Sequence, residues 1–202
     1  MLNYALTALF CFLTITVYAA PHGQVLECKP RGSGWAVANA TRNFWYSEGF
    51  YFDKRVCETA VKTAVGTDTF GVVCATNPNG SSVYSLHQGT IIANPRFYFN
   101  QVTVCALSLQ WMRDWVVCVP HEPSSMLYDI RNQRFIGEGN YYNSVEFCKW
   151  SSASASSNDS LACGPNRGGT AVYNRETGGL HSGRFYNRAE DCYRALRGND
   201  LP

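Results

Sequence analysis

The chain has 202 residues, with 17 Lys and Arg against 15 Asp and Glu, which gives a formal net charge of +2. The basic residues form no cluster, and this balance argues against nucleic acid or an anionic membrane surface as a partner. The length corresponds to one domain or two small ones.

The first 19 residues form an uncharged apolar run that ends in Val17-Tyr18-Ala19, with small residues at the −3 and −1 positions. This pattern predicts a secretory signal peptide over residues 1–19, cleaved near Ala19 or Ala20. The run is too short for a membrane anchor, which needs about 20 apolar residues. No later stretch is apolar enough to span a bilayer, so the mature chain is expected to be secreted, extracellular and free of the membrane.

Nine cysteines are present, and removal of Cys11 with the leader leaves eight. An even number of cysteines in an oxidising compartment predicts a framework of four disulfides. No two cysteines have the C-x2-C spacing of a zinc site, and the four histidines are scattered. We therefore expect no metal and no cofactor.

The eight cysteines fall into four pairs with separations of 29, 31, 30 and 29 residues: Cys28 and Cys57, Cys74 and Cys105, Cys118 and Cys148, Cys163 and Cys192. The first cysteine of each pair ends a short apolar run that predicts a β-strand. A proline follows within four residues and is expected to end the strand, because it has no N–H for the ladder: Pro30, Pro78, Pro120 and Pro165.

A second strand and a shorter third strand follow in each stretch, separated by turn residues. Second strands are expected at 35–37, 83–86, 126–130 and 171–173, and third strands around 44–45, 91–92, 135–136 and 180. Each stretch therefore begins with a small antiparallel meander.

Two aromatic residues and then Asp or Asn come next in every stretch: Tyr51-Phe52-Asp53, Tyr98-Phe99-Asn100, Tyr141-Tyr142-Asn143 and Phe185-Tyr186-Asn187. Asp and Asn accept hydrogen bonds from the free N–H groups of a first helical turn, so they predict helix N-caps. The helix that begins there carries the second cysteine. Asp53 is one residue closer to its cysteine than the three asparagines are to theirs, so we expect either a cap shifted to Phe52 or a slightly different entry into the first helix.

These elements predict an α+β fold of four tandem repeats of about 45 residues, each a short antiparallel β-meander followed by a short helix, stapled by disulfides. Residues 20–202 would form a single domain, with repeats at approximately 25–70, 71–114, 115–159 and 160–202. The helices are expected on one face of a shared antiparallel sheet, in a ring-like body or in two lobes of two repeats. The sequence makes no prediction of oligomeric state.

Two disulfide schemes are compatible with the spacing. Each strand cysteine pairs with the helix cysteine of its own repeat, or each helix cysteine pairs with the next strand cysteine and Cys28 closes a circle with Cys192. The steadier spacing favours pairing within a repeat.

Three Asn-X-Ser/Thr motifs are glycosylation candidates in a eukaryotic host, and each is expected in a loop: Asn39, Asn79 and Asn158.

Motifs of the large enzyme classes are absent, among them G-x-S-x-G, H-E-x-x-H and the P-loop. One set of side chains has the chemistry for phosphodiester cleavage as in small secreted ribonucleases: Tyr173, Glu176, His181 and Arg184. Such a site needs a second histidine, His121 or His87. The same four residues are also explained as solvated strand and turn positions, and we expect no enzymatic activity.

With a leader ending in Ala-Ala-Pro, paired cysteines and glycosylation motifs, the chain resembles in general build the small secreted cysteine-rich proteins of fungi, many of which act as effectors on a host. The resemblance implies no role for any particular residue. Our leading hypothesis is a secreted, non-enzymatic binding protein for an extracellular glycan or protein; the alternatives are a ribonuclease-type hydrolase and a structural wall or matrix component. Binding predicts a polar pocket or aromatic platform at two or more repeats. Hydrolysis predicts one site with Glu176, His181 and a second histidine.

Overall fold

A computed structural model describes residues 18–19, 23–47, 49–66, 69–121, 124–137, 140–156 and 159–198. Apart from the backbone of Tyr18 and Ala19, the predicted signal peptide lies outside these residues. Asn158, one of the three glycosylation candidates, also lies outside them.

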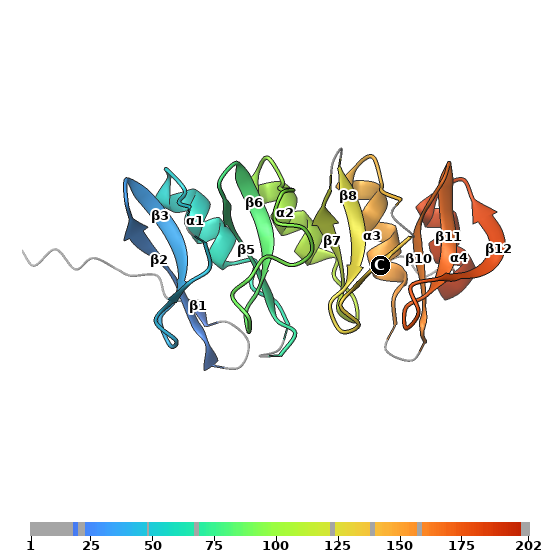
Figure 1. The fold of residues 1–202 in the computed structure, drawn as a ribbon, viewed down its shortest axis with the longest axis horizontal. Coiled ribbons are helices and arrows are strands. Elements are labelled where there is room, and N and C mark those ends of the chain that lie inside the picture. Colours follow the sequence, from blue (N-terminus) through green and yellow to red (C-terminus); the bar gives the residue numbers. More distant parts are fainter. Residues whose placement is uncertain are drawn as a thin grey trace, which may run out of the picture.

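The described part of the chain is α+β, with four helices and several small antiparallel sheets (Figure 1). The strands are β1 (Tyr18–Ala19), β2 (Val25–Arg31), β3 (Gly34–Asn39), β4 (Phe44–Trp45), β5 (Val72–Asn77), β6 (Gly80–Ser85), β7 (Val116–Pro120), β8 (Ser125–Asp129), β9 (Arg134–Ile136), β10 (Leu161–Asn166), β11 (Gly169–Asn174) and β12 (Leu180–Tyr186). The helices are α1 (Lys54–Val61), α2 (Val102–Gln110), α3 (Val145–Ser154) and α4 (Ala189–Arg197).

The elements follow one another as hairpin–helix segments, which we number from the N-terminus: β2 to α1, β5 to α2, β7 to α3 and β10 to α4. The third strand expected at 91–92 is absent from the second segment, where Ile91 makes only an isolated bridge to Tyr84.

The segments lie in a row along the longest axis, with each helix behind its hairpin (Figure 1). Each of the first three helices packs against its own hairpin and against the first strand of the next segment. In the described residues the strands form separate sheets, β1-β2-β3-β4, β5-β6, β7-β8-β9 and β10-β11-β12. The expected shared sheet is therefore wrong, and so are the ring and the two lobes, because helix packing rather than strand pairing joins neighbours.

One apolar core runs along this row. Buried side chains from Leu26 in β2 to Ala189 in α4 belong to one connected cluster. A small separate cluster in the fourth segment contains Cys163, Val172 and Cys192. No single hairpin and helix encloses such a core, so each segment depends on its neighbours for burial.

The hairpins share one register. The cysteine of each first strand lies opposite an aliphatic residue of the second, in the pairs Cys28 and Val37, Cys74 and Val83, Cys118 and Leu127, Cys163 and Val172. Turns between the two strands contain Gly32 and Gly168, both with positive φ, a conformation that glycine adopts without steric cost.

Two prolines lie inside strands rather than ending them. Pro30 is within β2 and Pro165 within β10, so the expected strand ends are wrong there. Trp35, opposite Pro30, bonds through both its N–H and its C=O to Tyr51 on the other side, at 2.7 and 2.6 Å. Pro30 therefore occupies a position whose nitrogen faces away from β3, where no donor is needed.

In the described ranges four disulfides join the strand cysteine of each segment to its helix cysteine: Cys28–Cys57, Cys74–Cys105, Cys118–Cys148 and Cys163–Cys192. This is the first of the two pairing schemes. The Cα–Cα distances lie between 5.9 and 6.1 Å, within the ordinary range for disulfides. In the chain-entropy model a closed loop of this length contributes about 3 to 4 kcal/mol to stability.

Each of the four helices has its N-cap at the fourth residue before its cysteine. The N-caps are Asp53, Gln101, Ser144 and Arg188, and each cap carbonyl accepts a hydrogen bond from the cysteine N–H at 3.3 to 3.4 Å. The predicted cap is therefore right for Asp53, and it is wrong by one residue for Asn100, Asn143 and Asn187.

The distance from the helix cysteine also shows which two residues form each aromatic doublet. Tyr51, Phe99 and Tyr142 bridge to the second strand of their own hairpins, as Tyr186 does within β12, and each is the sixth residue before its cysteine. The doublet of the first segment is thus Phe50-Tyr51 rather than Tyr51-Phe52. The first segment is not the exception that its spacing suggested.

A polar side chain at the end of each second strand closes the following turn. Asn39, Ser85, Asp129 and Asn174 each accept a hydrogen bond from the N–H three residues later, a local bond typical of Asx and Ser/Thr turns. Asn39 also donates to Gln24 at 3.0 Å and Tyr46 at 3.1 Å, and it is fully buried. Its expected place in an exposed loop is wrong, and a glycan on its amide is incompatible with this packing.

Buried charge joins the third and fourth segments. Arg175, after β11, donates to Asp129 at 2.8 Å and also pairs with Asp114. Arg175 and Asp129 are both buried, so each charge depends on the other for compensation. In the part of the chain that is described, no helix is long and apolar enough to cross a membrane.

Candidate functional site

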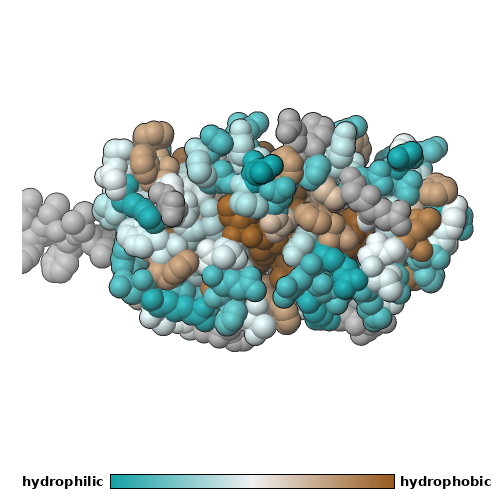
Figure 2. Space-filling model, viewed as in Figure 1, coloured by the Kyte–Doolittle hydropathy of each residue, from teal (hydrophilic) through white to brown (hydrophobic). Residues whose placement is uncertain are grey.

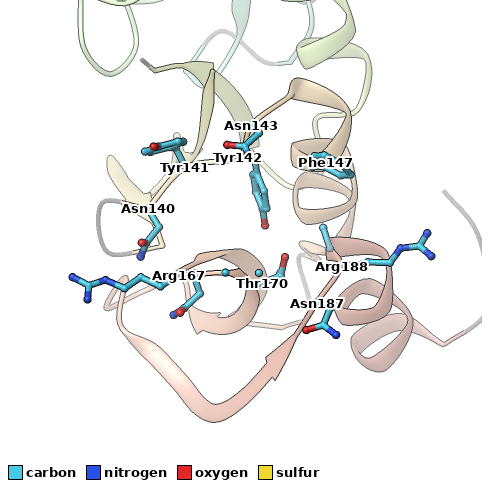
Figure 3. Close-up of a pocket in the computed structure, with 13 residues that line it drawn as sticks. Asn140, Tyr141, Tyr142, Asn143, Phe147, Arg167, Thr170, Asn187 and Arg188 are labelled. Atoms are coloured by element: carbon cyan, nitrogen blue, oxygen red, sulfur yellow. The ribbon is translucent and has the colours of Figure 1, made fainter. Parts of the chain in front are cut away.

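Two hollows of similar composition lie beside the hairpin turns. Groove A, of about 600 Å³, lies between the first and second segments; groove B, of about 550 Å³, lies between the third and fourth (Figure 3). Groove A is lined by Phe50, Tyr51, Phe52, Asp53, Val56, Thr76, Asn77, Pro78, Asn79, Gly80, Ser81, Asn100, Gln101, Val102 and Thr103. Groove B is lined by Asn140, Tyr141, Tyr142, Asn143, Phe147, Asn166, Arg167, Gly168, Gly169, Thr170, Asn187, Arg188 and Ala189.

The two grooves are built from matching positions. In each, one segment supplies its aromatic doublet and first helical turn, and the next segment supplies its hairpin turn and helix start. Asn77 and Asn166 are both the third residue after a strand cysteine, and Asn100 and Asn187 are both the fifth before a helix cysteine. A sequence alignment on the strand cysteines would have found Asn77 and Asn166, which our sequence analysis missed.

Glycine allows the doublets of the first, second and fourth segments to cross their hairpins. A Cβ at Gly80 would meet the carbonyl oxygen of Phe99, and a Cβ at Gly169 would meet that of Tyr186. Gly34 has the same relation to Tyr51. The backbone of the doublet therefore lies directly on the second strand at these positions, which places the helix start beside the hairpin turn.

A buried tyrosine forms the floor of each groove. The Tyr51 hydroxyl lies 3.2 Å from Ser81 of the next segment, and the Tyr142 hydroxyl bonds to Ser151 and to Thr170 of the next segment. In Figure 3, Tyr142 points across the groove toward Thr170. Burial raises the pKa of both hydroxyls, so both remain neutral hydrogen-bonding groups at physiological pH.

The rim of groove B combines aromatic and amide groups. Tyr141 is 43% exposed and Phe147 is 55% exposed, and they stand on either side of the groove in Figure 3. Asn143 and Asn187 are exposed as well. Arg167 and Arg188 point away from its centre, and Arg188 pairs with Glu190. Partly exposed rings beside amide donors and acceptors suit a ligand with both apolar and hydroxyl-rich faces.

The rim of groove A is more apolar. Phe52 is 84% exposed, and its ring meets that of Phe50 edge-on at 5.2 Å. Val56 and Pro78 line the same hollow. Among the described residues of the lining Asp53 is the charged one, and its carboxylate accepts a hydrogen bond from the Arg55 N–H at 2.8 Å in capping α1.

The junction between the second and third segments is filled differently. The ring of His121 lies 4.6 Å from that of Phe97 and 5.7 Å from that of Tyr141, and His121 is the counterpart of Asn77 and Asn166. Phe99 stands where the grooves have tyrosine, and Ser125 Oγ is among the buried polar atoms of the described residues that have no hydrogen-bond partner.

A further hollow, of about 590 Å³, lies on the strand face between the second and third segments, near the apolar patch at the middle of Figure 2. Its apolar lining includes Ile91, Ile92, Tyr128, Ile130 and Phe135. No member of the aromatic doublets lines it, so it is a separate surface from grooves A and B.

The residues named for phosphodiester cleavage do not share a groove. Tyr173 is fully buried, and its hydroxyl donates to the Pro165 carbonyl at 2.9 Å. Glu176 lies in the turn before β12 and lines a different hollow with Asp114 and Arg175. His181 and Arg184 are exposed on β12, where the Arg184 guanidinium lies 5.3 Å from the Tyr186 ring.

Neither candidate second histidine lies with them. His121 is held in the stack at the middle junction, and His87 lines the hollow on the strand face. Among the described residues, no group of three or more His, Cys, Asp or Glu side chains is placed to hold a metal ion.

Comparison with protein-family models, with curated proteins and with solved structures gives no match to this chain. We therefore infer a function from the chemistry of grooves A and B.

Proposed function

We propose that this chain is a secreted, non-enzymatic glycan-binding protein that holds its ligand along the edge formed by the hairpin turns. The observation that carries the proposal is the occurrence of matching grooves at two junctions. A binding protein built from repeated modules offers subsites of the same kind at more than one junction.

The proposal includes four tandem copies of one hairpin–helix module. Equal register in the hairpins, equal cap-to-cysteine spacing and an equivalent turn-closing side chain support a common module. The row of segments also agrees with the way small repeats share a core with their neighbours.

A glycan fits the grooves better than an apolar peptide does. Sugar rings have an apolar face that packs on aromatic rings and hydroxyl groups that bond to amides. In groove B, Tyr141 and Phe147 supply the rings, and Asn143 and Asn187 supply amides. The described residues that line groove B include no carboxylate, so they supply no acid and base pair for hydrolysis.

Secretion is part of the proposal. The apolar leader and the eight paired cysteines support an extracellular location, because disulfides persist in oxidising compartments. Action on a host organism, as in the proteins that the chain resembles, would follow from binding a host glycan. Detection of the mature chain in the culture medium tests the location.

A glycan array tests the binding role. The disulfide-intact protein should bind a defined set of oligosaccharides, and Tyr141→Ala with Phe147→Ala should weaken that binding by at least about tenfold, since stacked aromatic rings dominate such contacts. Phe44→Ala is the matched control, because Phe44 is 41% exposed but lies outside both grooves. An array without hits, or equal binding by all variants, would refute the proposal.

A further inference from the structure

Asn79 lies in the turn between β5 and β6, exposed, and lines groove A. It begins the motif Asn79-Gly80-Ser81. The matching position in groove B is Gly168. The two grooves therefore differ in a further chemical respect: the wall of groove A contains a candidate acceptor for an N-linked glycan, and groove B has none at that position.

The apolar rim of groove A lacks a cover. Phe52 is a large side chain that is 84% exposed, and it lies with Phe50, Val56 and Pro78 around the same hollow. Contiguous exposed apolar side chains on a monomeric protein mark a surface that something covers. The face of a sugar ring is suited to a phenylalanine ring, and Asn79 is the point in this lining from which a sugar would extend.

We propose that an N-linked glycan on Asn79 lies in groove A, with its first sugar packed on the Phe52 ring. Groove A is then filled by the protein's own glycan, and groove B is the subsite open to a free ligand. This inference rests on the proposed function, because it needs secretion and assigns the two grooves different roles.

The modification balances as an ordinary glycosyl transfer. The co-reactant is a lipid diphosphate oligosaccharide of the secretory pathway. A bond forms between Asn79 Nδ2 and C1 of the first sugar, the bond from C1 to the diphosphate oxygen breaks, the lipid diphosphate leaves with the electron pair of that bond, and the proton lost by the amide passes to solvent. In the folded chain Ser81 is buried and bonds to the Tyr51 hydroxyl, so the transfer takes place before the first and second segments pack together.

The test uses the full chain from a eukaryotic secretion host, with its own leader or, where that is not processed, a host leader. Glycopeptide mass spectrometry reads the occupancy of Asn79. The glycan is then trimmed to its first sugar, and thermal unfolding is compared with that of Asn79→Gln. The trimmed protein should melt about 2 °C higher, the scale expected for one added aromatic contact in a chain of this size.

Phe52→Ala should abolish that difference, because it removes the ring under the sugar. Phe52 is exposed, so the variant should fold. Phe147→Ala, the matched change in groove B, should leave the difference intact. An unmodified Asn79, or a difference that persists in Phe52→Ala, would overturn the inference. A glycan array without hits would refute the binding function and leave this thermal comparison unaffected, so the two failures are distinguishable.

Discussion

At the scale of single residues, Asn39 and Asn79 begin the same tripeptide motif in opposite surroundings. Asn39 ends β3, is fully buried and bonds to Gln24 and Tyr46, whereas Asn79 is exposed in a hairpin turn. The motif alone does not separate them, because burial depends on residues that are distant in the chain. Alignment of the four segments on their cysteines separates the two asparagines, because Asn39 matches the turn-closing positions of the other segments.

Asn39→Ala should therefore be costly. It removes a buried amide and leaves its partners unpaired, so we expect a loss of about 1 to 3 kcal/mol in the free energy of unfolding. Asn79→Ala in the same unglycosylated protein should change it by less than about 0.5 kcal/mol, as is usual for surface sites. Denaturant titration of disulfide-intact protein from a bacterial host measures both. Equal effects of the two changes would contradict the assignment.

Tyr51 and Tyr142 are buried at the contacts between segments. Burial raises the pKa of each hydroxyl above its ordinary value of about 10. The unfolded chain ionises these tyrosines near pH 10, whereas the folded chain keeps them protonated. Their contribution to stability is therefore complete below about pH 10 and is lost as the pH rises toward the folded pKa.

Tyr142→Phe should flatten this alkaline decline. We expect the free energy of unfolding to fall between about pH 10 and pH 11 in the unmodified protein, and to fall less steeply in the variant. Chemical denaturation at a series of pH values measures the slope. Tyr141→Phe changes the exposed neighbour and serves as the control. The explanation fails where both variants keep the original slope.

At the scale of elements, each hairpin and helix are held together by a crossing of the backbone as well as by a disulfide. The doublet lies on the start of the second strand, at a glycine in the first, second and fourth segments. The glycines are visible in the sequence as turn residues. Their role in the crossing follows only from contact with a carbonyl that is distant in the chain. Gly34, for example, lies against the carbonyl of Tyr51, about 17 residues later.

Gly169→Ala should be much more costly than Gly183→Ala. The added methyl group at Gly169 would overlap the Tyr186 carbonyl, whereas Gly183 has nothing within 4 Å of a Cβ. Forced overlap in a packed structure costs about 1 to 3 kcal/mol, and the exposed site should change by less than about 0.5 kcal/mol. Both residues belong to the same sheet, so a difference between the melting temperatures of the two variants reports the overlap at Gly169. Similar melting temperatures would rule out a tight crossing.

Phe99 is the second residue of its doublet, a position that tyrosine occupies in the other three, and the Ser125 hydroxyl of the next segment lacks a hydrogen-bond partner. Phe99→Tyr should supply the bond that Tyr51 makes to Ser81 and raise the free energy of unfolding by about 0.5 to 1.5 kcal/mol. In a Ser125→Ala background the gain should vanish. A gain that survives Ser125→Ala, or a loss of stability from overpacking, would contradict this account of the middle junction.

At the scale of the whole molecule, the row of segments makes stability a local property. Each helix packs between its own hairpin and the next strand, and a segment at the end has one neighbour instead of two. In such arrays unfolding begins and spreads by segment rather than across the whole chain. The small cluster of Cys163, Val172 and Cys192 at the C-terminal end depends on its own disulfide.

Replacement of Cys163 and Cys192 together by alanine should therefore unfold the fourth segment selectively. The loss of a loop of this length costs about 3 to 4 kcal/mol in the chain-entropy model. Hydrogen exchange should show loss of protection in β10, β11 and α4, while α1 and β5 keep theirs. Uniform loss of protection along the chain would show that the protein unfolds as one unit. Removal of groove B with the fourth segment should also abolish glycan binding there.

Local patterns in the sequence were sufficient for the order of strands, turns and helices. Apolar runs, glycine turns and the regular cysteine spacing predicted the hairpins and helices, because these signals act within a few residues of one another. They located Asp53 as a cap but misplaced the others by one residue. Gln101 and Arg188 cap α2 and α4 without side-chain bonds, whereas Ser144, and not the predicted Asn143, caps α3 through its hydroxyl. Helix ends set by packing carry no such local signal.

The tertiary structure alone decided how the segments stack and where the grooves lie. Each of these depends on contacts between residues far apart in the chain, such as Tyr51 with Ser81 or Arg175 with Asp129. Groove walls come from two consecutive segments, so neither segment contains the site by itself. Local sequence patterns specify each hairpin and helix, and the packing of one segment on the next creates the surface that we propose to be functional.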